Sequence, residues 1–239
     1  MKTFALISLL ALQVLHNAGA ADTCRATSGA TAPVVVELYT SEGCSSCPPA
    51  DRWLSTLKGR PDVLPLAFHV NYWDKLGWTD RFATPEGTAR QYELAKLDRT
   101  AGGGVYTPQV RAAGRDWRSW PRLPAADSTP APALSLMRDG DAVTAQVAAF
   151  AGAPRLSGYW AVLENQHRSQ VRAGENAGET LQHDHVVRLY RPVAAWSAGE
   201  GQRAQLQVSR GEALFPRRVV FVVTDAATAR PLQAVALGC

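Results

Sequence analysis

The sequence lacks several features that would assign it to a common class of protein. After the N-terminal segment, no stretch approaches the roughly 20 apolar residues that a membrane-spanning helix needs, so we expect no stable membrane insertion. The charge imbalance is weak, with 25 Lys and Arg against 21 Asp and Glu. The arginines are scattered rather than clustered beside stacking aromatic residues, which argues against nucleic-acid binding. No internal repeat is evident.

Cysteine is scarce, but the 4 cysteines fall at informative positions. Cys44 and Cys47 are three apart and follow the apolar, β-branched run 33–40. Residues at this spacing on a first helical turn lie close enough for their sulfur atoms to bond, so the pair can cycle between dithiol and disulfide without large backbone movement. Cys24 and Cys239 lie near the two ends of the mature chain, and the even total predicts that they pair as a structural disulfide.

The N-terminus has the pattern of an export signal. Lys2 precedes an apolar stretch over residues 4–14, and the small residues 18–20 offer a cleavage site before Ala21. We therefore predict a signal peptide over residues 1–20 and a periplasmic or secreted mature protein. In such an oxidising compartment paired cysteines are normally disulfides, and a reactive pair needs dedicated partners.

The composition changes near residue 120 and predicts two domains. Residues 119–132 contain four prolines, each of which removes a backbone donor, so we expect an extended linker there. Residues 21–118, before the linker, carry mixed helix and strand patterns. Residues 133–239, after it, carry seven short alternating patterns that are typical of an antiparallel β-sandwich.

The first half predicts a βαβ unit and further elements after it. The patterns indicate strands over 34–39 and 64–70, a helix over 49–57 between them, a second helix over 85–97 and an extended run over 105–110. The two strands should be parallel. Ligands gather beyond the carboxyl ends of parallel strands, so we expect the turn at Cys44 and the segment 71–74 to share one rim.

This order of elements resembles a thioredoxin-like domain, with Cys-x-x-Cys after the first strand and Thr107-Pro108 opening a hairpin. More specifically, the segments 43–51, 69–74, 105–109 and 174–176 resemble the secreted family catalogued as domain of unknown function 1223. The resemblance covers nearly the whole mature chain. That family is classed as thioredoxin-like and has no assigned substrate. It implies an α/β thioredoxin-like domain followed by a mostly-β, sandwich-like domain.

The resemblance also implies roles for individual residues. Cys44 would be the exposed attacking thiol and Cys47 the more buried resolving thiol, with the helix start stabilising the thiolate. Pro108 would be a cis proline facing the sulfur atoms, and the backbone of Thr107 would bind substrate as a strand does. The expected contacts with substrate at the rim are Tyr72, Trp73, Asp74 and Trp78.

Two prolines depart from this pattern. Pro48 and Pro49 each disfavour α geometry in the preceding residue, so the regular helix is expected to start at one of them. Cys44 would then lie in the preceding turn rather than on the helix terminus that would activate it.

Three functions remain open for the cysteine pair. The first is thiol–disulfide exchange without a cofactor. Its substrates would be small thiols or envelope proteins that carry thiols or disulfides, and it would need a redox partner. The second is a soft-metal module for copper or zinc, in which Cys44 and Cys47 supply two thiolates and His69 is one candidate for a further ligand. The third is a non-catalytic scaffold with an inert disulfide.

The polar segment 164–185 is a second candidate site, because connections of this length are often functional. On a strand, His183 and His185 would face the same side and would be able to ligate a metal, with His167 or Glu164 completing the shell. The commoner role of such histidines is to hydrogen-bond to the loop and fix its shape. Three arginines offer anion-binding or domain contacts instead: Arg168, Arg172 and Arg188.

Overall fold

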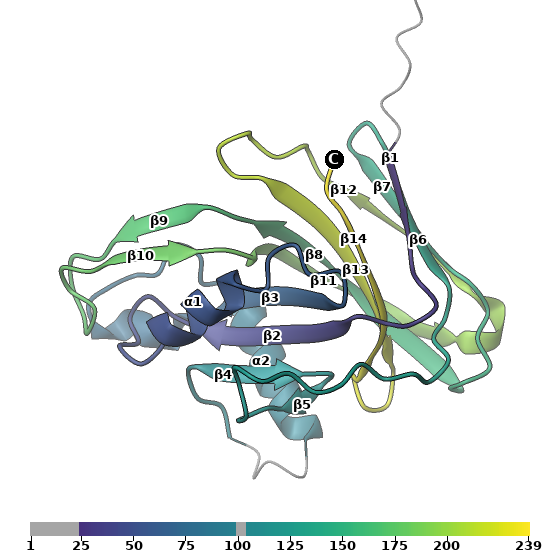
Figure 1. Cartoon of the computed structure of the whole chain (residues 1–239), viewed down its shortest axis with the longest axis horizontal. Coiled ribbons are helices and arrows are strands. Elements are labelled where there is room, and N and C mark those ends of the chain that lie inside the picture. Colours follow the sequence, from purple (N-terminus) through teal and green to yellow (C-terminus); the bar gives the residue numbers. More distant parts are fainter. Residues whose placement is uncertain (1–23, 99–103) are drawn as a thin grey trace, which may run out of the picture.

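Strands dominate the computed structural model of the chain, which describes residues 24–98 and 104–239 (Figure 1). The predicted signal peptide, residues 1–20, lies outside the described residues. The largest sheet contains, in spatial order, β14 (Pro231–Leu237), β13 (Arg217–Asp225), β8 (Arg155–Glu164), β11 (Val186–Ser197), β3 (Val63–His69), β2 (Val34–Thr40), β4 (Gln109–Ala112) and β5 (Arg115–Asp116).

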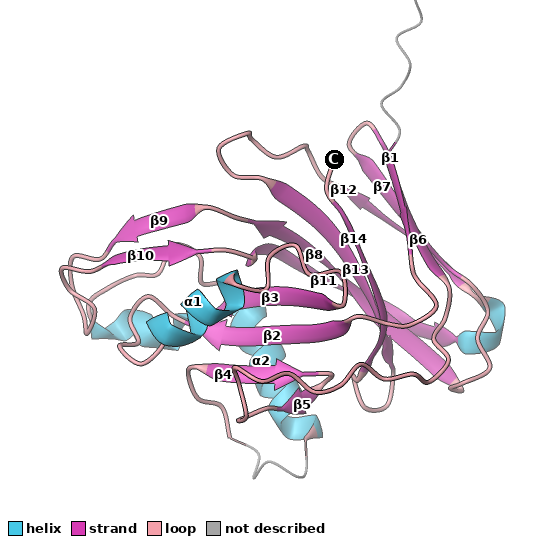
Figure 2. Ribbon diagram, viewed as in Figure 1, coloured by secondary structure: helices cyan, strands magenta, loops and turns pink. Residues whose placement is uncertain are grey.

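Two smaller strand groups and a few helices complete the described structure (Figure 2). The second sheet contains β1 (Cys24–Thr27), β6 (Leu134–Asp139), β7 (Ala142–Val147) and β12 (Gln202–Gln207). A two-stranded ribbon contains β9 (His167–Gln170) and β10 (Thr180–His183). The α-helices are α1 (Pro48–Ser55) and α2 (Pro85–Leu97), and the 3-10 helices are η1 (Asn71–Leu76) and η2 (Ala198–Glu200).

The predicted fold class is wrong. We expected a thioredoxin-like α/β domain with a separate sandwich, but the protein is mostly β, and strands from both sides of the linker 119–132 share the eight-stranded sheet. The two sets meet where β11 runs parallel to β3, with Val186 opposite Ala67. An open strand edge exposes unpaired backbone groups, and β11 covers the edge of β3. The sequence patterns predict strands but do not specify which edges pair.

The local βαβ prediction is confirmed. β2 and β3 pair in parallel, with Val34 opposite Val63, and α1 lies between them in the chain. Both strands are buried along their whole length. Alternate side chains face opposite helices: Val36 packs with Leu54 of α1, whereas Val35 packs in the same cluster as Leu94 of α2. The two helices therefore cover opposite faces of this part of the sheet.

A buried ion pair fixes α2 to the sheet. Arg90 of α2 donates to both carboxylate oxygens of Glu37 in β2, at 2.5 and 3.2 Å. The hydroxyls of Tyr39 and Tyr159 also donate to this carboxylate, at 2.8 and 2.7 Å. Burial raises the pKa of Glu37, but the charge and hydrogen bonds of Arg90 outweigh burial and lower it overall. Since Tyr159 lies in β8, this network joins strands from both halves of the sequence.

The two ends of the described chain are tied together. Cys24 in β1 and Cys239 form a disulfide that joins residues 215 positions apart, with Cα atoms 6.3 Å apart. Figure 1 shows the C-terminus beside β1 at the same end of the molecule. Within residues 24–98 and 104–239, no helix has the length and apolar character needed to cross a membrane.

Candidate active site

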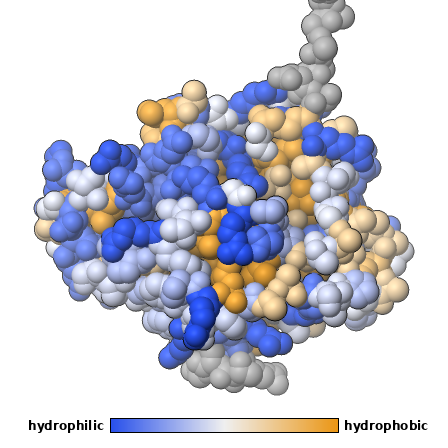
Figure 3. Space-filling view, viewed as in Figure 1, coloured by the Kyte–Doolittle hydropathy of each residue, from blue (hydrophilic) through white to orange (hydrophobic). Residues whose placement is uncertain are grey.

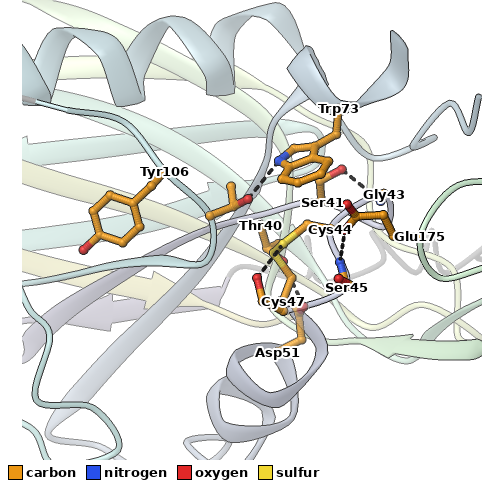
Figure 4. The surroundings of a disulfide bond; sticks show 12 residues. Thr40, Ser41, Gly43, Cys44, Ser45, Cys47, Asp51, Trp73, Tyr106 and Glu175 are labelled. Carbon is orange, nitrogen blue, oxygen red and sulfur yellow. Dashed lines mark hydrogen bonds between the residues drawn. A yellow bond between two sulfur atoms is a disulfide. The ribbon is translucent and has the colours of Figure 1, made fainter. Parts of the chain in front are cut away.

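Cys44 and Cys47 form a disulfide in the turn between β2 and α1 (Figure 4). Two backbone hydrogen bonds of 3.1 Å close this turn, from the Cys44 N–H to the Ser41 carbonyl and from the Cys47 N–H to the Cys44 carbonyl. The Ser46 hydroxyl lies 3.4 Å from Sγ of Cys44. A disulfide sulfur carries no hydrogen, so the hydroxyl is the donor. The same hydroxyl is placed to donate to a thiolate at Cys44.

Helix α1 begins directly after the disulfide. Cys47 is its N-cap, and Pro48 and Pro49 occupy its first positions, as the two prolines predict. Prolines have no N–H, and the N–H groups of Ala50 and Asp51 bond to the Cys47 carbonyl at 2.9 and 3.2 Å. The first turn of α1 therefore offers no free N–H group to a Cys44 thiolate. Such a thiolate depends on other donors, of which the Ser46 hydroxyl is one.

The ribbon β9–β10 closes over the disulfide. Both cysteines have 0% exposed area, whereas the resemblance implies an exposed Cys44. The cover comes from the hairpin tip, residues 174–178, where the Asn176 amide donates to the carbonyls of Glu42 and Cys44 at 2.9 and 3.0 Å. The carboxylate of Glu175 accepts from the Ser45 N–H at 2.9 Å. We call residues 174–178 the lid tip.

Trp73 lies beside the disulfide turn (Figure 4). The Trp73 indole donates to the Thr107 hydroxyl at 2.8 Å. Figure 4 shows the disulfide between Trp73 and Asp51. A side chain at Gly43 would meet Cβ of Trp73 at 3.2 Å, so glycine lets the turn approach Trp73 closely. The Thr107–Pro108 peptide bond is cis, as the resemblance implies, and leads into β4, which pairs with β2.

The other predicted rim residues contact neighbouring protein groups. The Tyr72 hydroxyl donates to Gln91 at 3.3 Å, and burial raises its pKa to about 12. Asp74 accepts from the Asp80 N–H at 3.1 Å. Trp78 donates to Glu42 at 2.7 Å. Asp74 and Trp78 thus support the segments around Asp80 and Glu42. The backbone carbonyl of Glu42 in turn accepts a hydrogen bond from Asn176 in the lid tip.

A buried polar cluster lies behind the disulfide turn. Nδ1 of His69 lies 2.6 Å from Oδ2 of Asp80. The Asp80 carboxylate also accepts from the N–H groups of Glu42 and Phe82, both at 2.9 Å. Burial raises the pKa of Asp80, but the charge and hydrogen bond of His69 outweigh burial and lower it to about 2. Burial lowers the pKa of His69, but Asp80 outweighs it and raises the value overall. The two side chains form a buried ion pair.

Asp51 joins this cluster from α1, one helical turn after Cys47. It accepts from the Thr40 hydroxyl at 2.8 Å. Burial raises its pKa, despite the lowering effect of His183 and His69. The sequence analysis gave Asp51 no role, although this residue ends the segment 43–51 that carries the family resemblance and lies four residues after Cys47.

The two histidines of the predicted pair do not lie on one strand. His183 ends β10, whereas His185 lies beyond the strand with a φ of 58°, so strand alternation does not relate them. His167 instead lies 3.0 Å from Glu164, which also pairs with Arg188 at 3.4 Å. His183 lies with Asp51 and His69, and among the described residues these three form a group whose potential ligand atoms are within 4.8 Å of one another.

Comparisons with known proteins give a family and a fold relationship. The family model described as "Protein of unknown function (DUF1223)" matches residues 35–224. No curated protein matches the sequence. The chain is similar to a crystal structure of protein AGR_C_4864 from Agrobacterium tumefaciens, with 28% identity, a TM-score of 0.64 and coverage of 87% of this chain and 94% of that chain. It is also similar in fold to HBP35 of Porphyromonas gingivalis, with 16% identity, a TM-score of 0.54 and coverage of 87% and 76%.

Proposed function

The chain belongs to the DUF1223 family of proteins of unknown function, and from this premise we propose that it is an exported thiol–disulfide exchange protein acting through Cys44 and Cys47. Its substrates are small thiols or envelope proteins that carry a thiol or disulfide. A separate redox partner returns the Cys44–Cys47 pair to its starting oxidation state. The proposal includes a cleaved signal peptide over residues 1–20 and a periplasmic or secreted location. The two disulfides are consistent with export.

The observation that carries the proposal is how the disulfide is covered. Cys44 and Cys47 belong to none of the hydrophobic clusters formed by the described residues. The lid tip instead covers them through three hydrogen bonds, two from Asn176 and one to Glu175. At about 1 kcal/mol net for each buried hydrogen bond, the two bonds of Asn176 hold the tip in place by about 2 kcal/mol. A state that lies a few kcal/mol higher is populated at roughly 0.1–10%, which gives a thiol regular access to the sulfur atoms.

The exchange reaction balances without a cofactor. A substrate thiolate attacks Sγ of Cys44, the Cys44–Cys47 bond breaks, and Cys47 leaves as a thiolate. A second substrate thiolate then attacks the substrate sulfur of this mixed disulfide and releases Cys44, so that the substrate becomes a disulfide and the pair becomes a dithiol. In the reverse direction Cys44 attacks a substrate disulfide and Cys47 resolves the intermediate. The Ser46 hydroxyl stabilises the charge on Cys44 in both directions.

Trapping in the export compartment tests this function. Cys47→Ser leaves Cys44 without its resolving partner, so mixed disulfides with substrates should accumulate and should disappear on reduction. Cys44→Ser should trap nothing, and a Cys24→Ser/Cys239→Ser variant that keeps the active pair serves as the control. Absence of trapping by folded Cys47→Ser would contradict the proposal.

The two competing functions predict different results. A soft-metal module would retain copper or zinc through its thiolates when purified in the reduced state, and Cys44→Ser would release the metal. A scaffold with an inert disulfide would neither trap partners nor hold metal through these cysteines.

A further inference from the structure

Three buried side chains outside the disulfide are arranged as a metal-ligand set. Asp51 comes from α1, His69 from the end of β3 and His183 from the end of β10, and their potential ligand atoms lie within 4.8 Å of one another. Their exposed areas are 8%, 1% and 3%. We propose that these residues bind a divalent transition metal of the zinc class, with a fourth coordination position facing the adjacent cavity. This inference does not depend on reactivity of the cysteine pair.

The donor set fits such an ion. Two imidazoles and one carboxylate suit zinc and neighbouring first-row metals, whereas magnesium and calcium prefer oxygen ligands alone. Zinc sites with three protein ligands and an open fourth position are typical of catalytic rather than purely structural centres. The set differs from both sites considered from the sequence, because it uses no cysteine and omits His185.

Buried nitrogen atoms without partners are the second observation. Nε2 of His69 and both ring nitrogens of His183 are buried and make no hydrogen bond. Nε2 of His183 lies 3.2 Å from a carboxylate oxygen of Glu42, without hydrogen-bond geometry. A buried polar atom that is left without a partner destabilises the fold by roughly 1–3 kcal/mol. Coordination to a metal would satisfy a nitrogen on each ring.

The surrounding contacts fix the candidate ligands in place. Nδ1 of His69 is held by Asp80 at 2.6 Å, which leaves Nε2 as the ligand atom. Asp80 is itself held by two backbone N–H groups. Metal-ligating histidines usually have a carboxylate or carbonyl on the other ring nitrogen, as His69 does here. Thr40 similarly holds one oxygen of Asp51, at 2.8 Å.

The charges of the cluster favour a cation. The carboxylates of Glu42, Asp51 and Asp80 are all buried around two histidines. Three carboxylates thus share two histidines, and a dication that replaces protons on the cluster balances this excess of buried acidic groups.

A cavity lies next to two of the three candidate ligands. A cavity of about 260 Å³ is lined by both Asp51 and His183, and its other lining residues are Pro48, Arg52, Thr180, Leu181 and Gln182. Phe82 packs against both histidines, with its ring centroid 5.3 Å from that of His69 and 5.4 Å from that of His183. Because β10 supplies both His183 and part of the cavity lining, the ribbon that carries the lid tip would also be fixed by the metal.

Metal titration of the mature full-length protein tests the site. The protein is kept oxidised, stripped with a chelator and dialysed against Zn²⁺ alone, and bound zinc is measured by elemental analysis. We expect stoichiometric binding, and Co²⁺ in place of Zn²⁺ should give a visible spectrum without thiolate-to-metal charge transfer. Asp80→Asn should weaken binding by about 10- to 100-fold. His183→Ala and Asp51→Asn, each of which removes a ligand, should weaken it at least as much.

A matched control separates ligation from folding. His185→Asn changes a buried histidine two positions after His183, and asparagine tolerates the positive φ at this residue. Zn²⁺ binding by this variant should be unchanged. If a variant folds poorly, a second measurement compares the rise in unfolding temperature that Zn²⁺ causes in the wild type and in Asp51→Asn, which changes the shape of the side chain least. Zn²⁺ should stabilise the wild type more than Asp51→Asn. The inference is overturned if the wild type binds no Zn²⁺, if Asp51→Asn and His183→Ala bind normally, or if Cys44→Ser/Cys47→Ser abolishes binding.

Discussion

The side-chain amide of Asn176 donates a hydrogen bond to the main-chain carbonyl of Cys44 at 3.0 Å, across 132 positions of sequence. The same amide reaches the carbonyl of Glu42, so one side chain holds the lid tip against both ends of a short turn segment. Figure 3 shows mostly hydrophilic residues on the visible face around the ribbon at the left of the view. Polar contacts of this kind hold the lid tip against the turn.

Loss of the Asn176 amide should open the disulfide to reductants. Asn176→Ala removes two hydrogen bonds worth about 1 kcal/mol each, so the rate of reduction by dithiothreitol should rise by roughly 10- to 30-fold. The rate is followed by timed alkylation and mass spectrometry. Glu179→Gln, at an exposed position in the same hairpin, should leave the rate unchanged. Equal rates for Asn176→Ala and the wild type would show that the lid tip does not control access.

The Ser46 hydroxyl should raise the reduction potential of the pair. It donates to Sγ of Cys44, and hydrogen bonds to a charged thiolate are stronger than those to a disulfide sulfur, so the hydroxyl favours the reduced state. Ser46→Ala should lower the potential by about 10–30 mV, which corresponds to about 0.5–1.4 kcal/mol for two electrons. Potentials are measured in glutathione buffers. Ser45→Ala removes a neighbouring hydroxyl that bonds to Glu175 and should shift the potential by less. A rise in potential for Ser46→Ala would contradict this assignment.

The Glu37–Arg90 pair should make stability depend on acid pH. The pKa of Glu37 is lower in the folded protein than its ordinary value of 4.5, so the carboxylate contributes stability above this pH and loses the contribution as the pH falls through the folded value. Glu37→Gln leaves Arg90 buried without its charged partner and should destabilise the protein by about 3–5 kcal/mol at neutral pH. Urea unfolding at neutral and acid pH should show that this difference shrinks in acid. The exposed variant Glu212→Gln should show no such change, and a pH-independent difference for Glu37→Gln would contradict the linkage.

Local features of this structure could be predicted from the sequence because they depend on neighbouring residues. The Cys44–Cys47 bond follows from three-residue spacing, and the start of α1 follows from Pro48. The parallel pairing of β2 and β3 follows from the βαβ pattern, and the cis bond before Pro108 from the family resemblance.

Features that join distant segments were not predictable in this way. The pairing of β3 with β11 depends on Ala67 meeting Val186, and no periodicity specifies which strand covers an open edge. The predicted fold class failed because the protein is mostly β, and this pairing merges strands from the two predicted domains into one mixed sheet. The group of Asp51, His69 and His183 likewise depends on the ribbon β9–β10, which the sequence presents as a polar connection.

The disulfide between Cys24 and Cys239 should be structural. It closes a loop with a sequence separation of 215, for which the chain-entropy model gives about 5 kcal/mol of stabilisation as an upper value. Cys24→Ser/Cys239→Ser should therefore unfold at a lower temperature and a lower urea concentration than the wild type, while the reduction potential of the Cys44–Cys47 pair stays the same. An unchanged unfolding midpoint would show that the Cys24–Cys239 disulfide does not stabilise the fold.

Equilibration of the folded protein with glutathione redox buffers tests the central claim most directly. Differential alkylation and mass spectrometry then report each cysteine pair separately, with the Cys24–Cys239 bond as an internal reference in the same molecule. We predict that Cys44 and Cys47 change reversibly between disulfide and dithiol while the protein stays folded and Cys24–Cys239 stays oxidised. A Cys44–Cys47 disulfide that resists every buffer until the protein unfolds would contradict the account.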